Sequence, residues 1–356
     1  MSAALLGKIE KADRRISPDL VARVDAALTA EGALLELFRE LVLVDPQAVT
    51  EISLAAESAS DVLQRMTRKI RYADHVMDAG SELNKLVAYG NCAQGLSSSL
   101  PEVARKELRR AIGEAFQLAG WIRFDHGDIF SARRLFASAT RAARDADALD
   151  LLAYIAGPNS AFMATFCGDA ATGVQGSYTA LGWARRSGNR RLTAFTMAIA
   201  ARAHARLGEA RQALEVLDSA AEELDRHDPS NDDPEWLSVF DRSALDGHRG
   251  SCLLDIGRCD DALKWLREQD AAGDQRFLRN RVIWRLDSAR ALLAMGEVEG
   301  GCAAIVDAFE AVRSKPVPPR VLSMFSSVAG VLTQWKNYPM AAQTSELVEQ
   351  IIGACD

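Results

Sequence analysis

Apolar residues recur at helical spacing along most of the chain, and from residue 115 onward short polar bends interrupt this pattern at regular intervals. Each bend is a Gly or Asn followed by a polar residue, and neighbouring bends lie 39 to 49 residues apart. Gly ends helices because it adopts the left-handed backbone conformation without strain, and Asn is the other residue that adopts it readily. The pattern predicts helix pairs joined at Gly127-Asp128, Gly168-Asp169, Gly208-Glu209, Gly257-Arg258, Gly296-Glu297 and Asn337-Tyr338.

Small residues flank the bends at fixed offsets. Two antiparallel helices pack closely only where small residues occupy the points at which the helices cross. Larger neighbours such as Phe136 and Leu217 are expected to fill the space between successive hairpins. Seven residues before the bends stand Gly120, Ala161, Ala201, Gly250, Ala289 and Gly330; five residues after them stand Ala132, Gly173, Ala213, Ala262, Gly301 and Ala342; and Ala recurs twelve residues after four of them, at Ala139, Ala180, Ala220 and Ala308.

This combination of offsets resembles the tetratricopeptide repeat. The resemblance covers residues 115–356, with a period of about 40 residues in place of the usual period of about 34. It implies an all-α fold, a superhelical solenoid of antiparallel helix hairpins, with a groove lined by the first helix of each hairpin. Before residue 115 the pattern predicts helices over 61–76 and 82–96, and a third that starts at Pro101. Residues 53–60 are expected to be a connector or a helix edge.

One interval is longer than the others and contains the segment HDPSNDDPEW, His227–Trp236. Its two prolines and its acidic residues disfavour helix. We expect an exposed loop between the third and fourth hairpins, followed by a new helix near Pro234.

Composition and charge limit the classes of function. Charged residues make up 26% of the chain and hydrophobic residues 48%, which is typical of a globular protein. The formal net charge of −7 disfavours a broad nucleic-acid surface, because phosphate contacts need Lys and Arg. The sequence has no signal-peptide core and no membrane-spanning apolar run, so we expect a cytoplasmic protein. The cysteines lie at Cys92, Cys167, Cys252, Cys259, Cys302 and Cys355, with no CxxC pair, which favours buried free thiols.

The first residues resemble the end of the helix-turn-helix domain of xenobiotic-response-element (XRE) type regulators. The matching features are Leu5 to Lys11, the basic pair at Arg14, and Ser17-Pro18, where Ser17 is a good helix N-cap. Leu6, Ile9, Leu20, Val24 and Leu28 match the core positions of that domain. The stretches AGWIRFDHGDIFSARRLF, DPEWLSVFDRSALDGHRGSCLLDIGR and ARAHARLGEARQAL resemble the sensor region of such regulators that contain tetratricopeptide repeats.

In that family the first two helices, and the start of the recognition helix that reads bases, would precede the first residue of this chain. Two alternatives therefore stay open for the N-terminal residues. They are either the remnant of a DNA-binding domain, with Lys8, Lys11, Arg14 and Arg15 as candidate DNA contacts, or a small helical cap on the solenoid. We divide the chain into residues 1–45, the helix-turn-helix remnant or cap; residues 46–114, a helical connector; and residues 115–356, the repeat domain.

The repeat resemblance also implies a ligand groove. An amide such as that of Asn159 offers a donor and an acceptor, which suits the backbone of an extended peptide. For Trp121, Phe162 and Phe166 the alternative is a place in the core between hairpins. The groove candidates are Trp121, Phe124, Asn159, Phe162, Phe166, Arg202, Arg206, Asp255 and Arg290.

The chain lacks the residue patterns that mark catalytic or cofactor sites, such as HExxH, a phosphate loop, GxSxG or a dinucleotide fingerprint. We expect no enzymatic activity, no cofactor and no metal centre. Two interpretations stay open for the acidic segment 225–235, which is either a cation site or a solvated loop. The Arg-rich segment 276–290 either binds an acidic partner or forms ion pairs within the chain. His204 either faces the groove or is a partly buried structural histidine.

Taken together, these patterns predict a cytoplasmic transcription-regulatory or sensor protein. Its repeat groove would bind a peptide, a protein or a small-molecule signal, and the protein could form a homodimer. DNA would be a partner only with a complete helix-turn-helix. The alternative is a protein-interaction scaffold without a role at DNA.

Overall fold

The computed structural model describes residues 21–22, 25–26, 32, 49–77, 82–97, 100–272 and 276–353, except for the side chains of residues 49–58 and 268–272. The chain divides into two compact units. Unit 1 comprises Met1–Ile70, Ala79–Gly120 and Arg134–Ala148, and unit 2 comprises Arg71–Asp78, Trp121–Arg133 and Leu149–Asp356.

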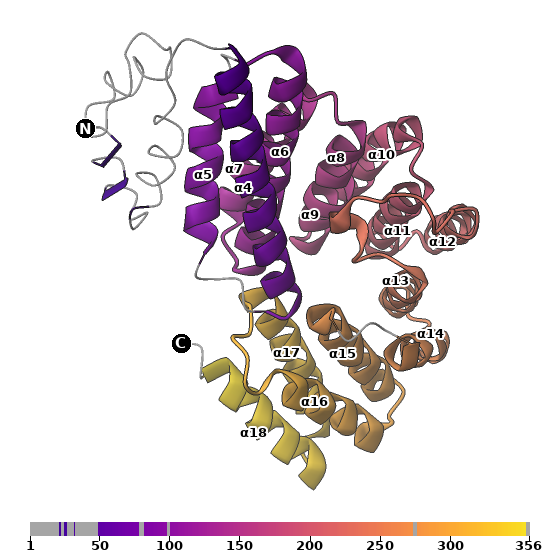
Figure 1. The fold of residues 1–356 in the computed structure, drawn as a ribbon. Helices are drawn as coiled ribbons and strands as arrows, with labels where there is room; N and C mark the ends of the chain where they lie inside the picture. Colours follow the sequence, from indigo (N-terminus) through magenta and orange to yellow (C-terminus); the bar gives the residue numbers. More distant parts are fainter. Residues whose placement is uncertain are drawn as a thin grey trace. The chain divides into compact units, whose positions relative to one another are not determined.

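The regular secondary structure of the described residues is helical, and no strand occurs among them. Within unit 2, consecutive helices from α8 to α18 form antiparallel pairs that stack in the order of the chain, in the manner of a tetratricopeptide-like solenoid (Figure 1). The predicted fold class is therefore confirmed. The helices are α4 (Val49–His75), α5 (Leu83–Leu96), α6 (Glu102–Asp125), α7 (Ile129–Asp145), α8 (Leu149–Tyr154), α9 (Phe162–Phe166), α10 (Ala170–Ser187), α11 (Arg190–Arg206), α12 (Ala210–Asp225), α13 (Arg242–Asp255), α14 (Cys259–Ala272), α15 (Leu278–Ala294), α16 (Val298–Val312), α17 (Pro319–Leu332) and α18 (Pro339–Gly353), with the π-helix η2 (Ile155–Ala161) and the 3₁₀ turns η3 (Glu235–Leu237) and η4 (Thr333–Trp335).

The helices predicted before residue 115 are present. The first, α4, begins at Val49, so residues 53–60 are helical and do not form a connector. The third, α6, begins directly after Pro101, as expected for a proline at a helix start.

Five of the six predicted bends turn through a left-handed glycine. The φ angles of Gly127, Gly168, Gly208, Gly257 and Gly296 lie between 76° and 93°. A side chain at these positions would be strained, which explains why glycine stands at each of these bends.

The sixth bend differs from the prediction. Asn337 is not among the described residues with a positive φ angle. Helix α17 instead tightens into η4, and the Tyr338 amide donates to the Trp335 carbonyl at 2.9 Å. The 3₁₀ turn shifts the register of the second helix by one residue, so Ala341 is buried and Ala342 is exposed.

The small residues at the helix crossings behave as predicted in the earlier hairpins. A Cβ added to Gly250 would lie 2.6 Å from Leu266 Cγ and 3.3 Å from the Ala262 carbonyl oxygen on the facing helix. A Cβ added to Gly301 would lie 2.7 Å from Leu293. Gly330, in contrast, is exposed and has no atom within 4 Å of such a Cβ, so its site does not require glycine.

Gly250→Ala and Gly330→Ala are therefore expected to change stability in opposite directions. Alanine favours helix over glycine by about 1 kcal/mol, and the open site at residue 330 keeps that gain. At residue 250, overpacking against Leu266 costs about 1–3 kcal/mol and outweighs it. Urea unfolding of both variants measures the two signs, and a stabilised Gly250→Ala variant would contradict the close crossing.

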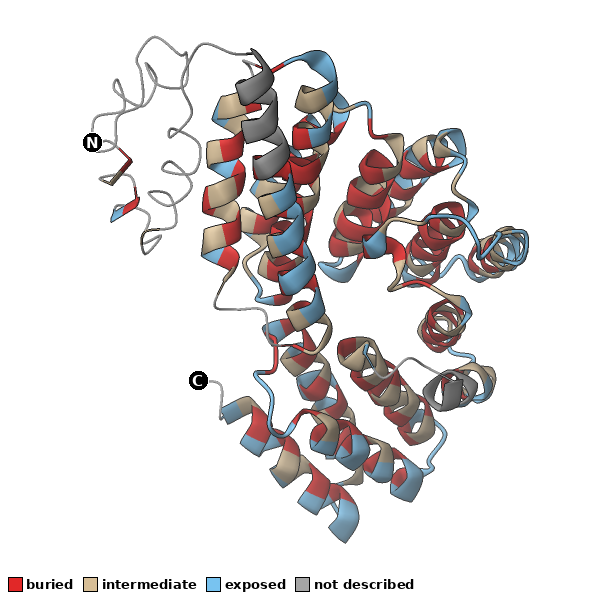
Figure 2. Cartoon of the chain, in the orientation of Figure 1, coloured by how far each residue is buried: buried red, intermediate tan, exposed pale blue. Residues whose placement is uncertain are grey.

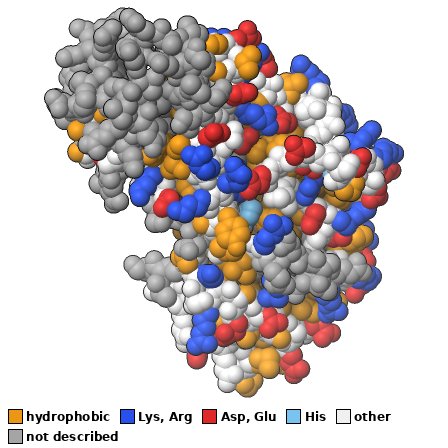
Figure 3. All heavy atoms as spheres, viewed as in Figure 1, with side chains coloured by type: hydrophobic (Ala, Val, Ile, Leu, Met, Phe, Trp, Pro, Cys, Tyr) orange, Lys and Arg blue, Asp and Glu red, His pale blue; other side chains and the backbone are white. Residues whose placement is uncertain are grey.

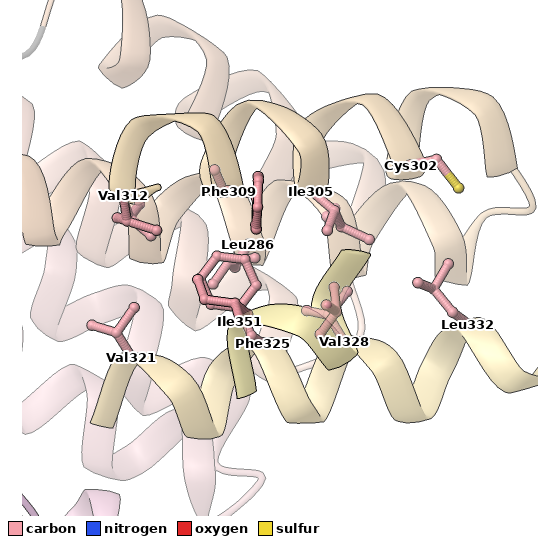
Figure 4. Packing of buried hydrophobic residues seen from close by; sticks show 14 of the residues in the cluster. Leu286, Cys302, Ile305, Phe309, Val312, Val321, Phe325, Val328, Leu332 and Ile351 are labelled. Carbon is pink, nitrogen blue, oxygen red and sulfur yellow. The ribbon is translucent and has the colours of Figure 1, made fainter. Parts of the chain in front are cut away.

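The last two hairpins enclose a continuous hydrophobic core. Leu286 on α15, Ile305 on α16, and Phe325 and Val328 on α17 each have no exposed surface, and Ile351 on α18 closes the same cluster (Figure 4). Over unit 2 as a whole, buried residues lie along the sides of helices that face neighbouring helices (Figure 2).

A π-helical segment interrupts the rod formed by α8 and α9. The nitrogen of Pro158 has no hydrogen and cannot donate to the carbonyl four residues before it. The chain widens at η2, and this places Asn159 inside the wide turn.

The segment after α12 is a loop that is exposed over residues 228–232, as predicted, but its end is buried. Trp236 is only 2% exposed, and its ring lies 4.4 Å from the ring of Tyr154. Asp233 accepts a hydrogen bond from Asn189 Nδ2 at 2.8 Å and pairs with Arg191 at 3.3 Å. The helix expected near Pro234 is the single turn η3, and α13 begins eight residues later.

Candidate functional site

Four aromatic side chains that the sequence assigned to the groove lie together in unit 2. Trp121 and Phe124 belong to the end of α6, and Phe162 and Phe166 belong to α9. The ring centroids in contact are 5.5 to 6.4 Å apart. Phe124 is buried, Trp121 and Phe162 are half-buried, and Phe166 is 38% exposed. We call these residues the aromatic cluster, and it reaches solvent at Phe166.

A buried arginine from the last hairpin lies among these rings. The guanidinium carbon of Arg320 is 5.3 to 5.8 Å from each of the four ring centroids. Its Nε donates to Asp125 Oδ1 at 2.5 Å, and the whole residue is 6% exposed. Aromatic faces attract cations, and the attraction strengthens when water is excluded. The aromatic cluster and Asp125 therefore form a complete cation-binding site, which Arg320 occupies.

A second arginine extends this arrangement. Arg279 Nη2 donates to Asp74 Oδ1 at 2.6 Å and to the Asp74 backbone oxygen at 2.5 Å. Arg279 Nε lies 2.8 Å from Asp125 Oδ2. We call Asp74, Asp125, Arg279 and Arg320 the Asp–Arg network. All four residues belong to unit 2, and none is more than 6% exposed.

Burial shifts the acid–base properties of the network. Burial raises the pKa of the Asp74 carboxyl above its ordinary value, although the charge of Arg279 opposes this shift. Burial alone would lower the pKa of the Arg279 guanidinium. The carboxylates of Asp125 and Asp74 have the larger combined effect, so the pKa of Arg279 lies above its ordinary value. Arg279 therefore stays charged, and a buried charge of this kind requires its partners.

Asn159, the predicted peptide-binding amide, is 2% exposed inside η2. Burial raises the pKa of the Tyr154 phenol, and the Asn159 side chain is one of the groups that oppose this shift. The Oδ1 atom of Asn159 has no hydrogen-bond partner among the described residues. An unpaired buried acceptor costs free energy, so this oxygen has an unused capacity to accept a donor.

The predicted charged groove residues form a second group on α11, α13 and α15. Asp255 Oδ2 accepts from Arg206 Nε at 2.8 Å and lies 3.7 Å from Arg202 Nη2. Arg290 donates to Asp287 Oδ1 at 3.1 Å, and Asp287 also accepts from Ser251. Each of these arginines already has a carboxylate partner within the chain.

Two histidines of unit 2 have internal roles. His204 is 7% exposed and contacts the Tyr178 hydroxyl at 3.2 Å and Glu209 at 2.5 Å, as expected for a structural histidine. His248 packs near the rings of Phe195 and Phe240. Burial, helped by the charge of Arg202, lowers the pKa of His248 to about 3.

His248 is expected to make the protein less stable in acid. Its folded pKa of about 3 lies below the ordinary value of 6.5, so the unfolded chain binds the proton first as pH falls. The contribution of this group to stability is complete above pH 6.5. It declines by about 1.4 kcal/mol for each pH unit below that value, down to about pH 3. Urea unfolding between pH 7 and 4 should show a smaller loss for His248→Leu than for the wild type. The exposed His126→Gln control should follow the wild type, and parallel curves for all three would contradict the prediction.

Sequence reasoning missed the Asp–Arg network. Asp74 and Arg279 are 205 residues apart, and Asp125 and Arg320 are 195 residues apart, so no local motif joins them. One signal was present, because α17 contains a single charged residue, Arg320, in an otherwise apolar and small-residue helix. In the Arg-rich segment 276–290, Arg279 has acidic partners inside the chain.

The other predicted sites add little to this picture. On the face seen in Figure 3, Lys and Arg side chains are scattered among Asp, Glu, hydrophobic and other residues of the described part of the chain. No described helix is long and apolar enough to cross a membrane. Among the described residues, no group of His, Cys, Asp or Glu is arranged to hold a metal ion. The candidate DNA contacts Lys8, Lys11, Arg14 and Arg15, and also Cys355, lie outside the described residues.

Comparison with known proteins supports the fold. No protein-family model matches the chain, and none of the curated proteins matches it. The solved structure of NprR in complex with its cognate peptide NprX is similar, with a TM-score of 0.55 and 15% identity over 95% of this chain and 90% of that one. Rap protein complexed with Competence and Sporulation Factor is also similar, with a TM-score of 0.54 and 11% identity over 95% of this chain and 98% of that one. At these identities the likeness shows a shared fold.

Proposed function

We propose that the chain is a ligand-sensing regulatory protein of the cytoplasm, without enzymatic activity, whose repeat domain binds a peptide signal. The observation that supports this most is the aromatic cluster, in which one exposed ring, two half-buried rings and a buried carboxylate meet on the first helices of successive hairpins. Repeat arrays bind extended ligands on these helices. NprR and Rap, which share the fold, were solved with NprX and with Competence and Sporulation Factor respectively.

Further residues complete the proposed site. Asn159 Oδ1 would accept a backbone amide of the ligand, which would satisfy a buried acceptor without a partner among the described residues. The second charged group would position the ligand termini, because its side chains would exchange ion pairs within the group for ion pairs with the ligand. These side chains are Arg202, Arg206, Asp255 and Arg290. Parts of the same proposal are the division into residues 1–45, 46–114 and 115–356, the XRE-type ancestry and the homodimer. DNA is a partner in this proposal only with a complete helix-turn-helix.

Peptide binding is tested by thermal unfolding and calorimetry with a pool of synthetic peptides. A ligand at about 100 times its dissociation constant adds about 2.7 kcal/mol to the stability of the folded state, so a true ligand gives a clear rise in Tm. Phe166→Ala is expected to weaken that ligand about tenfold, because it removes an exposed ring of the site.

Phe130→Ala provides the matched control. Phe130 is 71% exposed on α7 and does not belong to the aromatic cluster, so this variant should bind the ligand like the wild type. Equal loss in both variants would contradict the site. If no peptide, small-molecule signal or DNA binds to the chain, the sensor proposal is wrong and the scaffold alternative remains.

A further inference from the structure

Arg320 occupies its site in the way a bound ligand would. The four rings surround its guanidinium at 5.3 to 5.8 Å, and Asp125 accepts from its Nε. A structural arginine usually needs a carboxylate alone, whereas four aromatic rings around one cation form a recognition site for that cation.

The chemistry of the site favours a guanidinium over other cations. A guanidinium is planar, stacks on aromatic faces and donates hydrogen bonds in a fixed fork, so it can satisfy the rings and Asp125 together. A lysine ammonium is more strongly hydrated and loses more on entering an aromatic site. A quaternary ammonium has no hydrogen to donate to the buried carboxylate.

Helix α17 does not require Arg320 in the site. Arg320 is the second residue of α17, where the positive end of the helix dipole disfavours a cation. The helix is held instead by Val321, Phe325, Val328 and Leu332, which are fully buried in the last core (Figure 4). Arg320 can therefore leave the rings while α17 keeps its packing.

The site also has a route to solvent. Phe166 is 38% exposed, and Trp121 and Phe162 are half-buried, so the rings that contact Arg320 form part of the surface. An incoming side chain can reach the cluster from this side before Arg320 has left completely.

We propose that Arg320 is a resident competitor in a guanidinium-binding site, and that the ligand of this protein presents an arginine side chain that displaces it. The proposal rests on the proposed function and specifies the chemistry of the ligand. Displacement would exchange one guanidinium for another at Asp125, so the charge of the Asp–Arg network would be conserved while Arg320 moves to solvent.

The test uses Arg320→Ala and N-acetyl-L-arginine amide as the probe. An intramolecular competitor acts at an effective concentration of about millimolar or above, so its removal should tighten binding of the probe at least about tenfold in calorimetry. The control Arg313→Ala removes an arginine that is 69% exposed on the side chain and paired with Glu310, and it should bind like the wild type. N-acetyl-L-lysine amide should bind Arg320→Ala at least about tenfold more weakly than the arginine probe.

Three further measurements complete the test. If Arg320→Ala is unfolded alone, the arginine probe but not the lysine probe should restore its circular dichroism signal. Phe166→Ala added to Arg320→Ala should weaken the probe again. Free L-arginine separates a metabolite from a peptide residue, because stronger binding of the free amino acid than of the amide would identify a metabolite ligand and overturn the peptide arginine.

Equal affinity of wild type and Arg320→Ala, equal affinity for arginine and lysine, or no rescue of an unfolded variant would overturn the inference. Its failure is distinct from failure of the proposed function. A wild-type protein that binds only peptides without arginine keeps the proposed function and loses the inference. If Arg320→Ala binds the arginine probe but the wild-type protein responds to no peptide, the guanidinium-binding site is kept and the proposed function is lost.

Discussion

Replacing Asp125 with asparagine is expected to lower the free energy of unfolding by about 3–5 kcal/mol. Asp125 is 1% exposed, and its two oxygens face Arg320 and Arg279 at 2.5 and 2.8 Å. Asparagine keeps the volume of the side chain and removes the charge, so Arg320 would lose its carboxylate partner and Arg279 would keep only Asp74. Denaturant unfolding at pH 7 measures the loss.

The control for this prediction is Asp145→Asn. Asp145 is 54% exposed on its side chain and lies 3.7 Å from Arg109, a distance and exposure at which an ion pair contributes at most about 1 kcal/mol. A loss at Asp125 no larger than the loss at Asp145 would show that the network does not stabilise the fold.

The double variant Asp125→Asn with Arg320→Gln distinguishes the free energy of the ion pair itself from the cost of leaving Arg320 buried without a partner. Replacing both members of a buried pair costs much less than removing one, so the double variant should recover a large part of the lost stability. The difference from the sum of the single variants gives the coupling between the two side chains. Additive losses would contradict a direct interaction.

The bends could be predicted because their cause is local. Each of the five glycine bends needs one residue with a positive φ angle and small residues at fixed offsets from it, and all of these lie within about twenty residues of sequence. At the sixth bend a 3₁₀ turn reversed the chain without a left-handed residue, and Ala341 took the buried position expected of Ala342. A sequence pattern built on left-handed glycine bends cannot detect a bend that uses a 3₁₀ turn instead.

The candidate site could be predicted only in part. The repeat pattern placed Trp121, Phe124, Phe162 and Phe166 on first helices, and these four rings do meet. It did not indicate the cation among them, because Arg320 comes from the last hairpin and contacts Asp125 across 195 residues. Which of many charged residues pairs over such a distance depends on how the hairpins stack.

Two local features were also beyond the sequence pattern. A proline inside a helix predicts a break or a kink, but at Pro158 the chain remains helical by widening into η2. Likewise, the acidic segment after α12 has the composition of a solvated loop, yet Trp236 and Leu237, just after Pro234-Glu235, are buried. Two apolar residues within a polar segment were too short a signal to outweigh its composition.

Replacing Trp236 with alanine is the second large expected effect. Loss of a fully packed tryptophan costs about 3–5 kcal/mol, whereas a substitution in a solvated loop costs less than about 0.5 kcal/mol. The exposed Asp232→Ala in the same segment provides the control and should leave the stability unchanged within that limit. Denaturant unfolding decides between the two descriptions of the segment, and a Trp236→Ala variant as stable as Asp232→Ala would show that the segment does not pack as the structure describes.

The consequence of this substitution reaches the candidate site. The Trp236 ring centroid lies 4.4 Å from that of Tyr154, and the Asn159 side chain affects the pKa of the Tyr154 phenol. A cavity beside Tyr154 frees the phenol to move, which changes the surroundings of the buried Asn159 amide. We therefore expect Trp236→Ala to weaken a peptide ligand about tenfold at temperatures where the variant is still folded, while Trp236→Phe, which keeps a ring against Tyr154, should retain most of the affinity. Calorimetry on both variants tests this, and unchanged affinity in a folded Trp236→Ala protein would separate Asn159 from ligand binding.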